Sequence, residues 1–141
     1  MIGRIIMKGR NAEQQYKQMQ IKTAGPGKLL LMLYQGSIKF MKLAVKGIEL
    51  NNIEAAHENI IKAQNIILEL KGTLNKEQGG EIAKNLERLY DFIYQELLRA
   101  NLRKEKEHIE NVIPLVEDLF ESYQEIVKRQ SSKKLKVNVG G

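Results

Sequence analysis

Two pairs of residues in this 141-residue sequence have a spacing that could bind metal ions. Glu54 and His57 form one Glu-x-x-His pair, and Glu105 and His108 form another. On a helix, residues three apart lie on the same face. Di-metal four-helix bundles bind their metals through two such pairs together with one glutamate from each of the other two helices. This set of residues therefore raises the hypothesis of a di-metal enzyme.

The positions of the candidate ligands argue against that hypothesis. Glu49 and Glu96 could supply the two remaining carboxylates. However, Glu54 and Glu105 both open predicted helices, where the helix dipole alone favours a carboxylate. The inward-facing positions nearby carry Ile, Leu and Ala rather than metal ligands. We therefore expect no bound metal and no cofactor, and we keep the di-metal enzyme as an alternative.

Other catalytic patterns are also lacking. The sequence contains no cysteine, and Ser37 lies inside a predicted helix without a nucleophile-elbow motif around it. The segment Gly25–Lys28 reads GPGK, but it lacks the G-x-x-x-x-G-K-[ST] spacing of a phosphate-binding loop. These observations predict a protein that is not an enzyme.

Apolar residues recur every three or four positions from Pro26 onward. This periodicity predicts helices over 26–50, 53–74, 81–102 and 104–128. Because the connections between them are short, we expect antiparallel neighbours, and hence an all-α, up-down-up-down four-helix bundle. A polar N-terminal arm or short helix precedes the bundle.

The distribution of charge divides the chain further. We expect a single bundle domain over 1–127, made of an extension (1–10), an arm (11–24) and helices (26–127), followed by a basic flexible tail (128–141). The two end segments hold eight of the 23 basic residues and no acidic residue, so the remaining 15 basic residues face 17 acidic ones. The net charge of +6 is therefore no sign of a basic stripe on the folded surface, and we expect no nucleic-acid partner.

The sequence predicts neither a membrane span nor a secretory signal. No apolar run approaches the length of about 18 residues that a transmembrane helix requires. The opening MIGRIIMKGR has too short an apolar patch for a signal peptide. We expect a cytoplasmic protein.

The first predicted helix contains an uninterrupted apolar run at 29–34. Periodicity places Leu30 and Leu33 in the bundle interior. The apolar residues that lie partly away from the interior face of this helix are Leu29, Leu31, Met32, Tyr34 and Ile38. Three kinds of cover could bury them: two neighbouring helices, the arm with Tyr16 and Ile21, or a partner protein.

The residues around this run resemble the opening signature of the FliS family of flagellar export chaperones. The resemblance lies in NAEQQYKQMQIKTAGPGKLLLMLYQGSIKFM, and AHENIIKAQNIILELKGTLN and GGEIAKNLERLYDFI are similar to the second and third helices of the family. It covers about 11–127. Three positions depart from the family pattern: Gly25, Gln35 (where the family usually has an acid) and Ser37.

The resemblance implies a cytoplasmic chaperone; the sequence does not reveal its oligomeric state, and we favour a monomer. Such a protein binds the disordered C-terminal segment of newly made flagellin in apolar grooves, prevents premature polymerisation and assists delivery to the flagellar type III export apparatus. A helical adaptor or regulator for another secretion partner is an alternative on the same scaffold.

The resemblance also implies a set of partner-binding residues. The signature positions are Tyr16, Thr23, Ala24, Pro26, Leu30, Leu33 and Tyr34. Leu31 and Ile38 join them because of their place on the first helix, and we expect Tyr16 and Ile21 to cover the groove when no client is bound.

Overall fold

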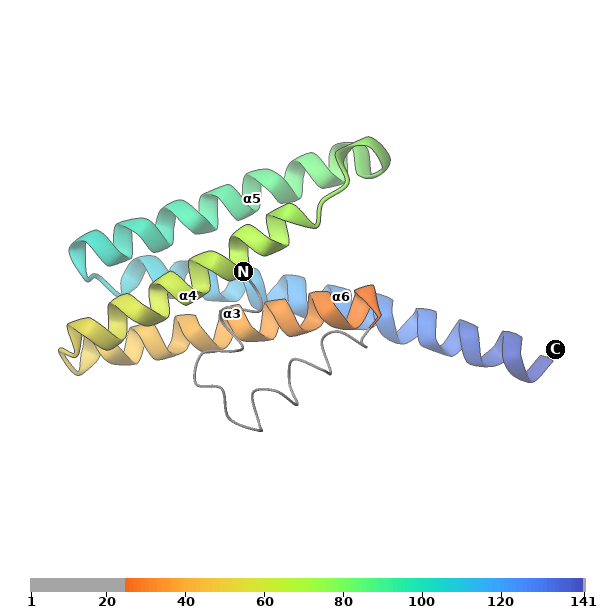
Figure 1. The fold of residues 1–141 in the computed structure, drawn as a ribbon, viewed down its shortest axis with the longest axis horizontal. Helices are drawn as coiled ribbons and strands as arrows, with labels where there is room; N and C mark the ends of the chain where they lie inside the picture. Colours follow the sequence, from red (N-terminus) through yellow and green to blue (C-terminus); the bar gives the residue numbers. More distant parts are fainter. Residues whose placement is uncertain (1–24, 141) are drawn as a thin grey trace.

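The computed structural model describes the backbone of residues 25–140 and the side chains of residues 25–130. Its helices are α3 (Pro26–Glu49), α4 (Ile53–Gly72), α5 (Lys76–Arg103) and α6 (Glu107–Gly140). Successive helices run in opposite directions, and α3 packs between α4 and α6 (Figure 1). The described residues contain no strand. The predicted all-α, up-down-up-down four-helix bundle is confirmed, whereas the arm at 11–24 lies outside the described residues.

Local sequence signals explain where three of the helices begin. Pro26 occupies the first turn of α3, where its missing N–H is not needed. The side-chain oxygen of Asn52 accepts a hydrogen bond of 3.1 Å from the backbone N–H of Ala55 at the start of α4. Asn75 accepts one of 3.1 Å from the N–H of Gln78 at the start of α5. Each asparagine thus satisfies one of the backbone donors that a helix leaves unpaired at its N-terminus.

Helix α5 begins earlier than the sequence predicts, at Lys76 instead of residue 81. Gly80 has φ 54° and ψ −129°, and it separates a first turn, Lys76–Gly79, from the long remainder of the helix. This backbone conformation is open essentially to glycine alone. Residues 76–79, predicted to form a loop, therefore form a capped turn. The kink at Gly80 joins this turn to the rest of α5.

Helix α6 ends later than predicted. It continues through 128–140, the segment predicted to be a flexible tail, and extends beyond the ends of the other helices (Figure 1). The segment 128–139 contains neither proline nor glycine, the residues that most often end a helix. Val127 of α6 faces Gly27, close to the start of α3. The helix therefore continues past the boundary predicted near Lys128.

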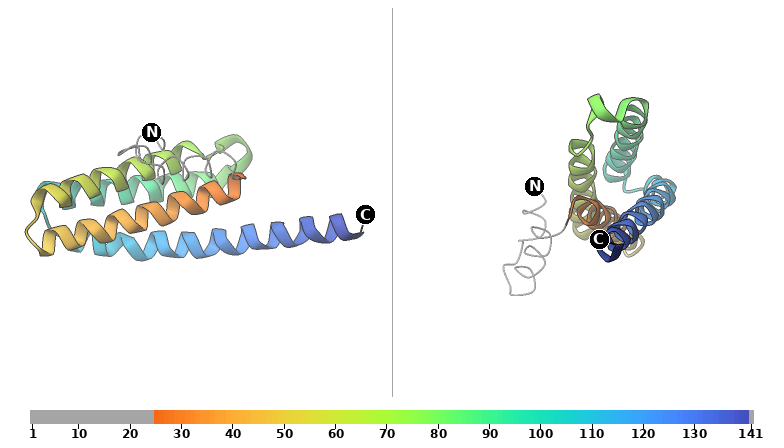
Figure 2. Two further views of the ribbon diagram at one scale, coloured as in Figure 1. Left: turned by 60° about the horizontal axis from the view of Figure 1, so that its bottom comes forward. Right: turned by 90° about the vertical axis from the view of Figure 1, so that its right-hand side faces the viewer.

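All four helices contribute to one apolar core. Its fully or nearly fully buried members are Leu33, Tyr34, Met41, Ala44, Ile60, Ala63, Ile66, Ile67, Leu70, Tyr90, Ile93, Leu97, Ala100, Ile109, Val112 and Val116. Near the connection of α3 and α4 the two backbones touch: a Cβ atom at Gly47 would lie 2.9 Å from the backbone nitrogen of Ala56. The pair α5 and α6 is close at its connection and diverges toward the start of α5 (Figures 1 and 2).

Candidate binding pocket where α3 and α5 begin

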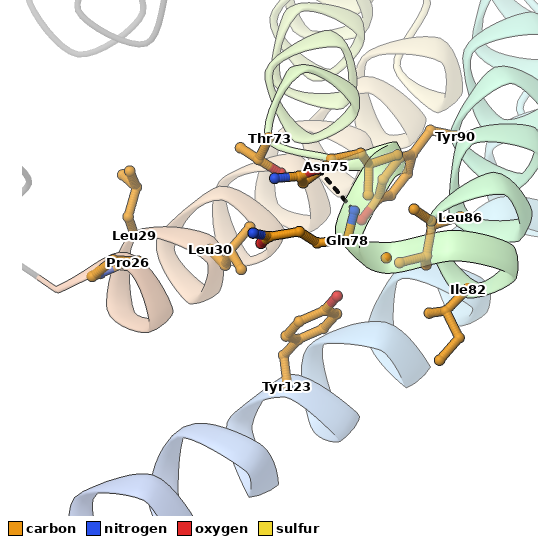
Figure 3. A pocket seen from close by; sticks show the side chains of 13 residues that line it. Pro26, Leu29, Leu30, Thr73, Asn75, Gln78, Ile82, Leu86, Tyr90 and Tyr123 are labelled. Carbon is orange, nitrogen blue, oxygen red and sulfur yellow. Dashed lines mark hydrogen bonds between the residues drawn. The ribbon is translucent and has the colours of Figure 1, made fainter.

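A pocket of about 460 Å³ lies at the end of the bundle where α3 begins and α4 connects to α5. Its walls come from α3, α5 and α6 and from that connection (Figure 3). The lining residues are Pro26, Leu29, Leu30, Thr73, Leu74, Asn75, Gln78, Gly79, Ile82, Ala83, Leu86, Tyr90 and Tyr123. None of them is charged, and most are apolar. A concave apolar surface with a few neutral polar groups is typical of a binding site.

Three tyrosines meet beside the pocket. The hydroxyl oxygens of Tyr34 and Tyr90 are 2.5 Å apart and share a buried hydrogen bond. The rings of Tyr34 and Tyr123 are tilted by 33°, with centroids 5.4 Å apart. Tyr123 projects from α6 into the pocket (Figure 3). This cluster joins α3, α5 and α6 through polar and aromatic contacts at the base of the pocket.

Both hydrogen-bonded tyrosines remain protonated over the physiological range. Burial, supported by the hydrogen bond to Tyr90, raises the pKa of Tyr34 far above its usual value. Burial likewise raises the pKa of Tyr90 to about 12. Each hydroxyl therefore retains its proton and stays uncharged in the apolar surroundings.

The rim of the pocket presents apolar side chains to solvent. Ile82 lines the pocket and is 72% exposed. Along α5, the residues Ile82, Leu86, Leu89 and Phe92 follow at i, i+4, i+7 and i+10, a spacing that keeps them on one side of the helix. Phe92 is itself exposed. The apolar side of α5 therefore continues beyond the pocket, as expected for a surface that contacts a long partner segment.

The structure separates the predicted site residues on α3 into two groups. Pro26 and Leu30 line the pocket. In contrast, Leu33 is buried in the core, and Tyr34 is fully buried against Tyr90 and Tyr123. Apolar periodicity predicts Tyr34 partly off the core, and this prediction is wrong: its ring lies among helices that are distant in sequence.

The half-buried Leu31 and Ile38 lie along the boundary between α3 and α6. On α3, Gly27 faces Val127, Tyr34 contacts Tyr123 and Lys42 pairs with Glu117 at 3.4 Å, so all three contact α6. Leu31 and Ile38 fall between these residues at helical spacing, and therefore on the same side.

Neighbouring helices thus account for much of the cover over the apolar run. On the other side of α3, a Cβ atom at Gly36 would approach Ile66 of α4 to 3.1 Å. Leu29 and Leu30 remain at the pocket, where a partner or the arm could reach them. Of the other predicted site residues, Tyr16, Ile21, Thr23 and Ala24 lie outside the described residues.

Sequence reasoning missed the pocket residues that come from other elements. Thr73, Asn75 and Gln78 lie in or beside the connection of α4 and α5, where no periodic pattern points to a site. Tyr90 and Tyr123 also line the pocket, from α5 and α6. The sequence shows that both residues are aromatic and lie on helices. Whether they meet in space depends on how the helices pack.

The glutamates and histidines considered as metal ligands form other pairs. The Glu96 carboxylate is 2.9 Å from Nδ1 of His108 and 2.6 Å from a guanidinium nitrogen of Arg99. The hydrogen bond from His108, with that from Arg99, holds the pKa of Glu96 below its usual value despite burial. This carboxylate therefore serves as the acceptor in a contact that ties the start of α6 to α5.

Of the remaining candidate ligands, Glu105 lies 3.9 Å from Nε2 of His108, whereas Glu49 and His57 have other partners. Glu49 forms an ion pair of 2.8 Å with Lys106, and His57 hydrogen-bonds Asn101. Within residues 25–130, no three His, Asp or Glu side chains are grouped so that they could bind a metal ion. These pairings argue against the di-metal alternative.

The comparison with known proteins agrees with the geometry. Residues 9–130 match the family model described as flagellar protein FliS. The chain belongs to the FliS family. The Bacillus subtilis FliS-family protein, named a flagellar secretion chaperone, is 37% identical over 132 residues, which span 94% of this chain and 96% of that protein. Its Salmonella typhimurium counterpart, with the same name, is 38% identical over 112 residues, or 79% of this chain and 83% of that protein.

A solved structure shows that the fold is shared with a flagellar chaperone. A crystal structure of a bacterial flagellar chaperone superposes with a TM-score of 0.70 at 24% identity, covering 84% of this chain and 96% of that one. FliS-family relatives are named as chaperones in flagellar secretion, and this general function is supported for the present chain. Across the residues that the structure describes, no helix combines the length and apolar character that crossing a bilayer demands.

Proposed function

We propose that this FliS-family protein is a cytoplasmic chaperone for newly made flagellin. It binds the disordered C-terminal segment of flagellin, prevents premature polymerisation and assists delivery to the flagellar type III export apparatus. The monomer is the proposed binding unit, without metal or cofactor. The observation that supports this proposal most is the uncharged, largely apolar pocket where α3 and α5 begin.

The composition of the pocket suits the apolar face of an amphipathic segment. A disordered client loses conformational entropy when it becomes ordered, so its binding energy must come from extensive apolar contact. Leu29, Leu30 and Leu86 supply such a surface inside the pocket, and Ile82 and Phe92 extend it along α5. Helical segments bound in apolar grooves are a common mode of peptide recognition.

We propose that the arm competes with the client for this pocket. Pro26, a lining residue, is the first residue of α3, so the preceding segment joins the bundle at the pocket's edge. In this proposal Tyr16 and Ile21 cover the pocket in the free protein, and Thr23 and Ala24 connect them to α3. In this proposal Leu33 and Tyr34 support the pocket from within the core, and the parts of Leu31 and Ile38 that α6 leaves exposed contact the client along the boundary of α3 and α6.

The proposal is tested by titrating the full chain with the C-terminal fragment of flagellin from the same organism. Isothermal titration calorimetry should show saturable binding with a negative heat-capacity change, because apolar surface is buried. Hydrogen exchange on the same samples should show faster exchange at 11–24 once the client displaces the arm. No heat of binding at high micromolar fragment would contradict the proposed function.

A further inference from the structure

An exposed apolar strip runs along the pair of helices α4 and α5. Its members are Ile61 and Leu68 of α4 and Leu98 of α5, which are 38%, 42% and 37% exposed. The two helices lie side by side (Figure 1). None of the three residues lines the pocket, so this α4–α5 strip is a second apolar surface.

Two polar contacts between the helices show that these residues share one side of the pair. Nζ of Lys71 is 2.7 Å from the Asp91 carboxylate, and His57 hydrogen-bonds Asn101. On each helix, the strip residues and the contact residues fall within about 80° of one another around the axis. The strip therefore lies between the two contacts, which are 14 residues, or about 21 Å, apart along α4.

The segment 1–7, which precedes the described residues, has a composition that suits this strip. It reads MIGRIIM, with five apolar residues among seven. In an extended conformation the odd-numbered residues, which include no polar side chain, share one side, and Arg4 lies on the other. Extended, the segment spans about 20 Å, close to the distance between the two contacts.

The chain outside the described residues is long enough to bring this segment to the strip. Pro26 lines the pocket together with Thr73, which is two residues beyond Lys71 at one end of the strip. Even with Tyr16 held at the pocket, residues 8–15 alone extend over about 26 Å. The tether therefore spans the whole length of the strip.

We propose that the segment 1–7 docks in an extended conformation on the α4–α5 strip of its own molecule. Docking removes aliphatic surface from water on both sides of the contact. A tethered segment is at high effective concentration, whereas a second molecule loses translational and rotational freedom on binding. The inference goes beyond the proposed function, because the strip is separate from the pocket proposed for flagellin and the segment precedes residues 9–130, the part that matches the FliS family model.

Disulfide trapping tests the contact directly, because the sequence contains no cysteine. Ile5→Cys is combined with Leu68→Cys in the strip, or with Leu43→Cys on α3 as the matched control, since Leu43 is 41% exposed and lies outside the strip. When the dilute full chain is oxidised with glutathione disulfide, the pair with Leu68→Cys should close an intramolecular disulfide at least about fivefold faster, because closure needs Cβ atoms about 4 Å apart. Intact-mass spectrometry and thiol counting follow both reactions.

The outcomes distinguish this inference from other occupants of the strip. Equal rates for the two pairs, or faster closure with Leu43→Cys, would overturn it. Disulfide-linked dimers as the main product of the pair with Leu68→Cys would identify a second molecule as the occupant and also overturn it. The experiment contains no flagellin, so its failure leaves the proposed function intact.

A second measurement leaves the strip itself unsubstituted. In Ile5→Asp/Met7→Asp protein with labelled methyl groups, a soluble paramagnetic probe should broaden the Leu68 and Leu98 methyl NMR signals more than in the unsubstituted protein, because a charged segment leaves the apolar strip. The methyl signals of Leu43 should broaden equally in both proteins. Equal broadening of the strip signals in the two proteins overturns the inference.

Discussion

Nδ1 of His108 lies 2.9 Å from the Glu96 carboxylate, and this contact joins the first turns of α6 to α5. The two residues are twelve positions apart in sequence and meet across the connection between these helices. Glu96 is nearly buried and also accepts a hydrogen bond from Arg99. A carboxylate that gains two charge-assisted hydrogen bonds on folding is more acidic in the folded than in the unfolded protein.

We expect this contact to make the stability depend on acid pH. Because folding lowers the pKa of Glu96 from the usual value near 4.5, its contribution is fully present above that value. The contribution is lost as pH falls through the lower pKa of the folded state. Thermal melting from about pH 6 to pH 3 should show a steeper loss of stability in the unsubstituted protein than in Glu96→Gln. Identical acid profiles for the two proteins would show that Glu96 makes no such contribution.

The exposed rim of the pocket provides a test of client contact with little effect on folding. Ile82→Gln should weaken binding of the flagellin fragment about tenfold, since a buried aliphatic side chain contributes about 1.5–3 kcal/mol. Leu102→Gln is the matched control, because it lies on the same helix, is 77% exposed against 72% for Ile82, and does not line the pocket. Fluorescence anisotropy with a labelled fragment would measure the affinity of each variant. Equal affinities for the two variants would remove Ile82 from the site.

The kink at Gly80 predicts opposite effects of alanine at two glycines. Gly80→Ala should destabilise the protein by about 1–3 kcal/mol, because φ 54° with ψ −129° is strained for any residue with a Cβ atom. Gly72→Ala should instead stabilise it by about 0.5–1 kcal/mol, because Gly72 is helical and a Cβ atom there would meet no neighbouring atom. Urea denaturation measures both changes. A neutral Gly80→Ala would mean that the turn Lys76–Gly79 rearranges without cost.

Leu31 and Leu33 differ in burial, and aspartate should distinguish them. Leu33 is only 4% exposed, so Leu33→Asp buries a charge and should destabilise the bundle by about 4 kcal/mol or more. Leu31 is half-buried, and Leu31→Asp should leave the helical content and the melting temperature largely intact. If Leu31 contacts the client, as we propose, the same variant should bind flagellin about tenfold more weakly. Circular dichroism and calorimetry report the two effects separately, and an unfolded Leu31→Asp would place that residue in the core.

Local sequence signals were enough to predict the helices, with the largest boundary errors at the start of α5 and the end of α6. Apolar periodicity and the asparagines at 52 and 75 indicate where helices form and begin, since both act within a few residues along the chain. The early start of α5 was missed because a single capped turn before Gly80 reads as a loop. The continuation of α6 to Gly140 was missed because the helix was predicted from apolar periodicity, and that periodicity ends before the helix does.

The candidate site was only partly predictable. Pro26 and Leu30 were found because they belong to one continuous segment that resembles a family signature. Gln78 and Tyr90 of α5 and Tyr123 of α6 were not, because they lie far from α3 in sequence and no local pattern links them to it.

By itself, the sequence determined the all-α class, the order of the helices and the resemblance to the FliS family. These properties follow from residue type and spacing along the chain. The tertiary structure alone decided that Tyr34 faces inward to Tyr90 and that Glu96 meets His108. A run that is apolar on every side, such as 29–34, does not specify which of its faces lies inward. Its orientation is decided by the neighbouring helices, which offer each side chain either apolar contact or a hydrogen-bond partner.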